Sequence, residues 1–312
     1  MKPLDVTQET ALPVLRALKT MAVADGRLEA RKRAFVDGYQ EDAGLSLDFD
    51  SIENITPDAL AASITDQDLR TAIVQRMVIV ALLDEEAHPK EIEALRAFAK
   101  ALGVSEPAIH QMELARYGHV RRLAFDMLRH GFLARVFRNE WNARGLRGIL
   151  SSVRGMSGGK NAAIAAKFRA LGDLPLGTLG THYMAYMAAN RFPLPGEPKG
   201  APEMLIFHDI GHALTGYSTD VPGEMRMAGF EAGYMREDGF GVVALGLFGF
   251  HMGIPLPNIA ACRGGFDMEA IEQGYRLGRR LNVDLRGWDP WPYMDRHLDE
   301  VRAALGLDGE ST

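Results

Sequence analysis

Two histidines and two carboxylates form the strongest chemical pattern in this sequence. His208 and His212 are four residues apart, so on an α-helix both imidazoles project from one face, a turn apart. Asp209 adds a carboxylate beside them, and Glu224 follows after a turn-forming segment. Imidazole nitrogen and carboxylate oxygen suit zinc, iron, manganese or cobalt. The spacing therefore predicts a divalent-metal site with His208, Asp209, His212 and Glu224 as ligands, the alternative being a chance histidine pair on a helix.

The residues around the histidines predict how these side chains are positioned. Pro202 suits the opening of the motif helix, and Gly216 suits its left-handed end. Asp220 can cap the next helix, which places Glu224 in that helix's first turn. Glu231 lies two turns further on the same side. We therefore expect Glu231 to be a candidate for orienting a ligand histidine.

The overall composition excludes several classes of protein. Of the 312 residues 47% are hydrophobic and 24% are charged, which is typical of a globular protein rather than a disordered one. The net charge of −6 argues against nucleic-acid binding by the whole molecule. The single cysteine, Cys262, cannot form an internal disulfide, which suits a reducing cytoplasm. The N-terminus lacks a signal-peptide pattern, and the longest apolar run, 240–256, is broken by glycines, so we expect no transmembrane segment.

Hydrophobic periodicity predicts an all-α fold. Apolar residues recur at helical spacing in 12–21 and in 69–83, and strand signals are absent from 8–115. From residue 172 onward the pattern is again helical. We therefore predict two helical domains, 1–115 and 172–312, joined by a basic helical linker at 116–171.

The predicted linker is strongly basic. Its arginines and lysines alternate with leucines and aromatic residues, while Asp126 and Glu140 are its only acids. Such a basic amphipathic helix can lie on an anionic membrane surface. The alternative is an inter-domain helix whose arginines contact the acidic remainder of the chain. The segment 151–159, rich in Gly and Ser, predicts a flexible break.

The first domain contains a weak internal sequence repeat. Segments 21–28 and 80–87 each run from an apolar helix end into an acidic turn before a further helix. On these turns the domain resembles the TerB-like (tellurite-resistance B) helical domain. Lys32 stands where the first copy should offer a glutamate, and Glu85 replaces the glycine of the second copy. We therefore interpret the region as a pair of solvated helix starts on an interaction module, without a metal.

The second domain resembles the coenzyme Q biosynthesis protein four family over residues 172–307. The central motif is His208-Asp209-x-x-His212 followed by Glu224. Flanking matches are Leu174-Pro175-x-Gly177-Thr178-x-Gly180, Leu214-Thr215-Gly216-Tyr217, Thr219-Asp220-Val221-x-Gly223, Gly278-Arg279-Arg280, Trp288 and Glu300-Val301-Arg302.

This resemblance implies a function. Members of the family are all-helical, associate peripherally with membranes, bind a divalent metal through the His/Asp/His/Glu set and hold a polyprenyl chain in an apolar groove. Their proposed role is oxidative decarboxylation at C1 of a polyprenylated aromatic ubiquinone precursor, or scaffolding of other quinone-biosynthesis proteins. The expected location is cytoplasmic or peripheral on the inner face of the membrane. The metal, the tail length and a homo-oligomeric state are left open.

The predicted ligands make chemical sense of this activity. A metal with open positions would polarise a phenolic or carboxylate oxygen as a Lewis acid. Glu224 and Asp209 are the predicted catalytic residues, and Asp209 either binds the metal or orients a ligand histidine. Seven methionines in this half line an isoprenoid groove or pack the core. A His-Asp type phosphohydrolase would need a further His and Asp, for which the sequence offers no compelling pair.

Overall fold

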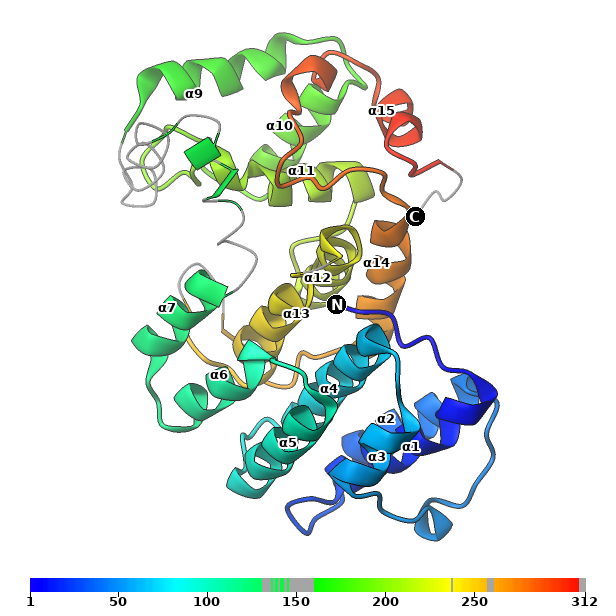
Figure 1. Cartoon of the computed structure of the whole chain (residues 1–312). Coiled ribbons are helices and arrows are strands. Elements are labelled where there is room, and N and C mark those ends of the chain that lie inside the picture. The colour runs from blue at the N-terminus through cyan, green and yellow to red at the C-terminus, as the bar shows by residue number, and fades with distance from the viewer. Residues whose placement is uncertain are drawn as a thin grey trace. The chain divides into compact units, whose positions relative to one another are not determined.

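The computed structural model describes residues 1–130, 136, 138–139, 141–142, 145, 160–236, 238–256 and 261–308. Across these ranges the regular elements are helices, no strand ladder is present, and two isolated antiparallel bridges join Thr178 to His297 and Met252 to Arg263 (Figure 1). The predicted all-α fold is confirmed. The chain forms two compact units: unit 1 contains 1–130 and 243–266, and unit 2 contains 131–242 and 267–312.

Unit 1 is built around a helix that is buried on every side. Its helices are α1 (Gln8–Ala22), α2 (Ala30–Asp42), α3 (Pro57–Ser63), α4 (Gln67–Leu82), α5 (Pro89–Leu102), α6 (Pro107–Arg116) and α7 (Val120–His130), with a 3-10 turn η1 (Phe49–Ser51). Every residue of α4 from Ala72 to Leu82 is buried. A helix that is apolar nearly all round belongs inside a core, and α1, α2 and α5 all contact α4.

Unit 1 also contains a segment from far along the sequence. Helix α13 (Phe240–Gly246) continues into a π-helical turn, η4 (Leu247–His251). The imidazole of His251 is fully buried, where Nε2 donates to the Leu83 carbonyl and Nδ1 accepts from the Phe266 amide. Residues 243–266 are thereby anchored to the end of α4, an excursion that the sequence did not predict. The domain boundaries at 115/116 and 171/172 remain predictions.

Unit 2 holds the histidine motif in a single apolar core. Its elements are α9 (Ala162–Arg169), η2 (Ala170–Asp173), α10 (Leu179–Ala189), η3 (Glu203–Leu205), α11 (Ile206–Thr215), α12 (Val221–Met235), α14 (Met268–Arg280), η5 (Trp291–Tyr293) and α15 (Leu298–Ala304). The core brings together Tyr183 of α10, Ile210 of α11 and Phe230 of α12. It therefore fixes α11 and α12, the two motif helices, from their apolar sides.

Helices α12 and α14 pack backbone against backbone through glycines. A Cβ at Gly229 would lie 2.0 Å from the Ile271 carbonyl oxygen, and one at Gly278 would lie 2.0 Å from the Phe230 carbonyl oxygen. A Cβ at Gly274 would lie 1.9 Å from the Arg226 carbonyl oxygen, and one at Gly233 would lie 2.6 Å from the Tyr275 carbonyl oxygen. Any side chain at these positions would force the helices apart. The glycines at i and i+4 on both helices thus set the position of α12, which carries Glu224 and Glu231.

The described residues include 116–130 and 160–171 of the predicted linker and six positions between them, whereas the predicted break at 151–159 lies outside them. In α7, Leu123 is buried while Arg121, Arg122 and Phe125 are exposed. Within the described ranges no helix has the length and apolar character needed to cross a bilayer.

Candidate metal centre

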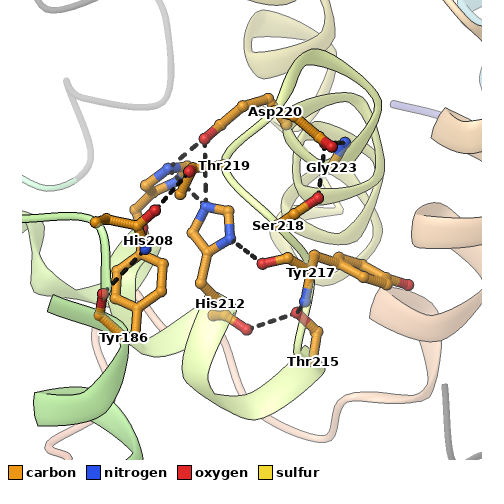
Figure 2. Close-up of polar contacts among 12 residues, drawn as sticks. Tyr186, His208, His212, Thr215, Tyr217, Ser218, Thr219, Asp220 and Gly223 are labelled. Carbon is orange, nitrogen blue, oxygen red and sulfur yellow. Dashed lines mark hydrogen bonds and ion pairs between the residues drawn. The ribbon is translucent and has the colours of Figure 1, made fainter. Parts of the chain in front are cut away.

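A helix, a tight turn and a second helix carry the predicted ligands. Helix α11 ends at Thr215 because Gly216 takes the left-handed conformation, with φ of 75°. Helix α12 begins after Asp220, whose Oδ1 accepts a 2.8 Å hydrogen bond from the Gly223 amide. Figure 2 shows this turn folded over the His212 ring. The sequence-predicted stop and cap are both confirmed, and they bring Glu224 back to the histidines.

Both motif imidazoles present the same nitrogen to one point. His208 donates from Nδ1 to Glu231 Oε1 at 3.0 Å, and His212 donates from Nδ1 to the Tyr217 carbonyl at 2.8 Å. A neutral imidazole that donates from Nδ1 has a free lone pair on Nε2. The two Nε2 atoms lie 3.3 Å apart. Each ring is thus fixed by a partner on its far side, in the manner of metal-binding histidines.

Glu224 completes the arrangement. Its Oε2 lies 3.6 Å from His208 Nε2 and its Oε1 lies 3.6 Å from His212 Nε2. One ligand atom from each of these three residues falls within 4.8 Å of the others. Two nitrogens bound to one tetrahedral ion at about 2.0–2.1 Å would be about 3.4 Å apart. The separation of the two nitrogens therefore matches a shared divalent cation, and His208, His212 and Glu224 could hold one.

The electrostatics of the site favour a cation. Burial and the neighbouring His208 both lower the pKa of His212, to about 4. The Nε2 lone pair of His212 is therefore available at neutral pH. Burial opposes charge on His208 as well, yet Glu231, Glu224 and Asp209 together raise its pKa to about 10. Three carboxylates thus surround one imidazolium in the metal-free chain. A divalent cation would replace that proton and compensate more of the negative charge.

Asp209 lies beside the three-residue cluster rather than in it. Burial raises the pKa of Asp209 to about 6, an effect opposed by His208 and reinforced by Glu231. Because the second nitrogens of the histidines are bonded to Glu231 and to the Tyr217 carbonyl, the orienting role considered for Asp209 is filled by other groups. Its assignment as a ligand or catalytic residue remains a prediction.

The neighbourhood includes groups that sequence reasoning missed. The Tyr186 ring stacks on His212 with centroids 5.0 Å apart, and Phe192 meets Tyr186 edge-on at 5.9 Å. Thr219 Oγ1 donates to Asn190 Oδ1 at 2.7 Å, which ties the turn to the end of α10. A backbone carbonyl acceptor such as that of Tyr217 leaves no signature in residue type.

The sequence left open whether the seven methionines of this half line an isoprenoid groove or pack the core, and the structure divides them between these two roles. Five of the seven are buried and pack the protein interior: Met187, Met225, Met227, Met235 and Met252. Met184 and Met204 are only partly buried against it, so they remain candidates for an apolar binding surface.

Comparison with family models and with curated proteins finds no match to this chain.

Proposed function

We propose that this protein is a metal-dependent enzyme of ubiquinone biosynthesis that removes the C1 carboxyl group from a polyprenylated aromatic precursor. The observation that carries the proposal is the convergence of His208 Nε2, His212 Nε2 and Glu224 on one point. The motif resemblance supplies the substrate class. Zinc, iron, manganese and cobalt all suit the donor set.

The exposure of the ligands supports a catalytic rather than a closed structural site. The His212 side chain is fully buried, whereas that of His208 is 37% exposed and that of Glu224 is 19% exposed. A bound metal would supply Lewis acidity toward a phenolic or carboxylate oxygen. With only three protein ligands, positions would remain open on the exposed side. His208 and Glu224 then border the side from which a substrate oxygen approaches.

The aromatic flank of the site supports an aromatic, lipid-linked substrate. His212, Tyr186 and Phe192 form a continuous series of ring contacts, and Phe192 is 42% exposed. The series offers flat apolar surface between the ligands and solvent, which suits a benzene ring or a prenyl tail. Carboxyl removal releases CO₂ and leaves electron density on C1. Replacement of the carboxyl by hydroxyl would in addition require an oxidant such as dioxygen.

The partners follow from the same proposal. A polyprenylated substrate resides in a membrane, so the protein would work on an anionic membrane surface beside other quinone-biosynthesis proteins. The exposed Arg121, Arg122 and Phe125 of α7 supply basic and aromatic side chains suited to that surface.

Complementation tests the proposal. A host that lacks C1 decarboxylation should regain quinone when it expresses this chain, and should lose that rescue with Glu224→Gln. Glu269→Gln, an exposed position on α14, serves as the matched control and should rescue fully. Mass spectrometry should show the carboxylated intermediate accumulating only with Glu224→Gln.

The same experiment separates the enzyme from its alternative, a prenyl-lipid-binding scaffold with a structural metal. Full rescue by a folded but metal-free Glu224→Gln chain would defeat the catalytic assignment and leave the scaffold. Loss of rescue while binding of prenylated lipid persists would support the enzyme, because the apolar surface does not depend on that charge.

A further inference from the structure

Helix α10 ends in a left-handed turn that carries an arginine. Its cap residue is Asn190, and Arg191 follows with φ of 56°. The Arg191 amide donates to the Ala188 carbonyl at 3.1 Å, and the Phe192 amide donates to the Met187 carbonyl at 2.9 Å. This pair of bonds is the Schellman motif, in which the left-handed residue after the cap is usually glycine. An arginine is disfavoured there because its Cβ crowds the backbone.

Other helix ends of this chain show the usual residue at that position. Four of them form the same two backbone bonds, and each has a glycine in the left-handed conformation: Gly44, Gly103, Gly118 and Gly306. The end of α10 therefore departs from this pattern in residue type but not in backbone geometry. An unfavourable conformation that is retained at one end only is explained if the side chain has a use.

The Arg191 side chain is available to a ligand. The residue is exposed, and its guanidinium forms no hydrogen bond or ion pair with the other described residues. By contrast, the exposed Arg169 of α9 is paired with Glu197 at 2.5 Å. Within the described part of the chain, the guanidinium of Arg191 therefore does not tie the end of α10 to another segment.

A row of aromatic rings connects this turn to the candidate metal centre. The Phe192 ring, 42% exposed, meets Tyr186 edge-on with centroids 5.9 Å apart, and Tyr186 stacks on His212 at 5.0 Å. Asn190 Oδ1 also accepts a 2.7 Å hydrogen bond from Thr219 Oγ1, in the turn between the two motif helices. The backbone of the arginine is thus fixed at the outer end of the aromatic row.

A guanidinium beside exposed aromatic surface suits an aromatic carboxylate. The planar guanidinium offers two parallel N–H donors, which match the two oxygens of a carboxylate. A benzene ring can lie against flat apolar surface such as that of Phe192. A phosphate group would use the same donors but would make no use of the rings. The two features together favour an aromatic acid.

We propose that Arg191 binds the carboxylate of the aromatic substrate and thereby selects the acid over the neutral, decarboxylated product. This assignment rests on the proposed function and adds a residue that distinguishes substrate from product. Loss of CO₂ removes the group that the guanidinium holds, so the product should dissociate more readily than the substrate.

Binding of two short-tailed ligands tests the proposal. The probes are a geranylated hydroxybenzoic acid and the geranylated phenol that lacks its carboxyl group. Tryptophan fluorescence measures their dissociation constants for the full chain, for Arg191→Gly and for Lys199→Gly as the matched control. Lys199 is also exposed and basic, with φ of 65°, so its replacement removes the same charge from a similar backbone conformation.

The expected result is a loss of selectivity in one variant only. Arg191→Gly should bind the acid about tenfold more weakly, because charge-assisted hydrogen bonds are lost, and should bind the phenol as before. Lys199→Gly should bind both ligands as the unchanged protein does. Equal affinity of Arg191→Gly and the unchanged protein for the acid would overturn the proposal and leave the proposed function standing.

Thermal unfolding separates a binding role from a structural one. Glycine adopts the left-handed conformation without strain, so the Tm of Arg191→Gly should equal or exceed that of the unchanged protein. An arginine retained for stability would give the reverse, a lower Tm with unchanged selectivity, and that result would overturn the proposal.

Two further outcomes identify other errors. If the unchanged protein binds neither ligand, the proposed substrate class is wrong and the assignment of Arg191 fails with it. Vesicles that contain phosphatidylglycerol test the phosphate alternative. If Arg191→Gly loses vesicle binding but keeps the preference for the acid, the guanidinium contacts lipid phosphate instead and the proposal is overturned.

Discussion

Units 1 and 2 each gather carboxylates at a helix–turn–helix, yet they supply the positive charge differently. In unit 1 the Lys32 ammonium lies 2.5 Å from Asp84 and from Glu91. In unit 2, no lysine or arginine among the described residues is ion-paired with Glu224 or Glu231, whose contacts are with the histidines. A cation supplied by the chain is always present, whereas one bound from solution links the site to metal concentration and pH.

The difference depends on which residue types lie beside the carboxylates. Lysine at the third position of α2 makes the unit 1 cluster self-contained. Histidines on α11 instead offer lone pairs that bind a proton or a metal in competition. Only the unit 2 centre is therefore expected to exchange its cation, which suits chemistry rather than structural stability.

The largest expected effect is on metal content. The double change His208→Ala and His212→Ala removes two of the three convergent ligands, so metal retained after metal-free purification should fall to near zero. Elemental analysis measures it, with His182→Ala, an exposed histidine on α10, as the control. An unchanged metal content in the double variant would refute the site and, with it, the contrast between the two units.

A smaller loss of metal affinity is expected from Glu231→Gln. Glu231 does not belong to the three-ligand cluster but holds His208 by Nδ1 at 3.0 Å. Loss of such an outer partner typically weakens metal binding about 10–100-fold. Competition with a chromophoric chelator measures the affinity, and Glu269→Gln should leave it unaltered. Affinity equal to that of the unchanged protein would mean that Glu231 does not orient the ligand.

The affinity should also depend on pH, in a direction set by His208. Its pKa of about 10 in the metal-free chain means that metal must displace a proton at every pH below that value. Apparent affinity should therefore rise about tenfold per pH unit from about pH 7 to 9, with one proton released per metal. His212, with a pKa of about 4, adds no dependence in this range. Calorimetry in buffers of different ionisation enthalpy counts the protons, and a count near zero would contradict the assignment.

The smallest expected effect is on the pH dependence of stability in unit 1. Burial raises the pKa of Glu91 from 4.5 to about 7, against the opposing influence of Lys32. A carboxyl group whose pKa is raised by folding stabilises the fold at low pH and loses that contribution as pH rises toward 7. Relative to Glu91→Gln, the unchanged protein should therefore lose a few degrees of Tm between about pH 4.5 and 7. If the Tm of the two proteins changed with pH in the same way, the raised pKa of Glu91 in the folded protein would be contradicted.

The sequence by itself determined the local part of the candidate metal centre. Spacing of four residues places His208 and His212 on one helical face, and Gly216 and Asp220 specify where one helix ends and the next begins. These features depend on side chains within one or two turns of each other. The same locality allowed the all-α class and the apolar helix α4 to be predicted.

Tertiary structure alone decided which distant segments contact one another. Three features join parts of the chain that no sequence periodicity marks. They are the packing of Gly229 and Gly233 against the helix of Gly274 and Gly278, the hydrogen bond from His212 to a backbone carbonyl, and the burial of Lys32. The 243–266 excursion into unit 1 is likewise invisible in the sequence. Local propensity acts over a few residues, whereas burial and charge pairing depend on which distant surfaces meet. For that reason the sequence could place the candidate ligands on their helices, but it could not predict the packing that orients them or the burial of Lys32 among the carboxylates of unit 1.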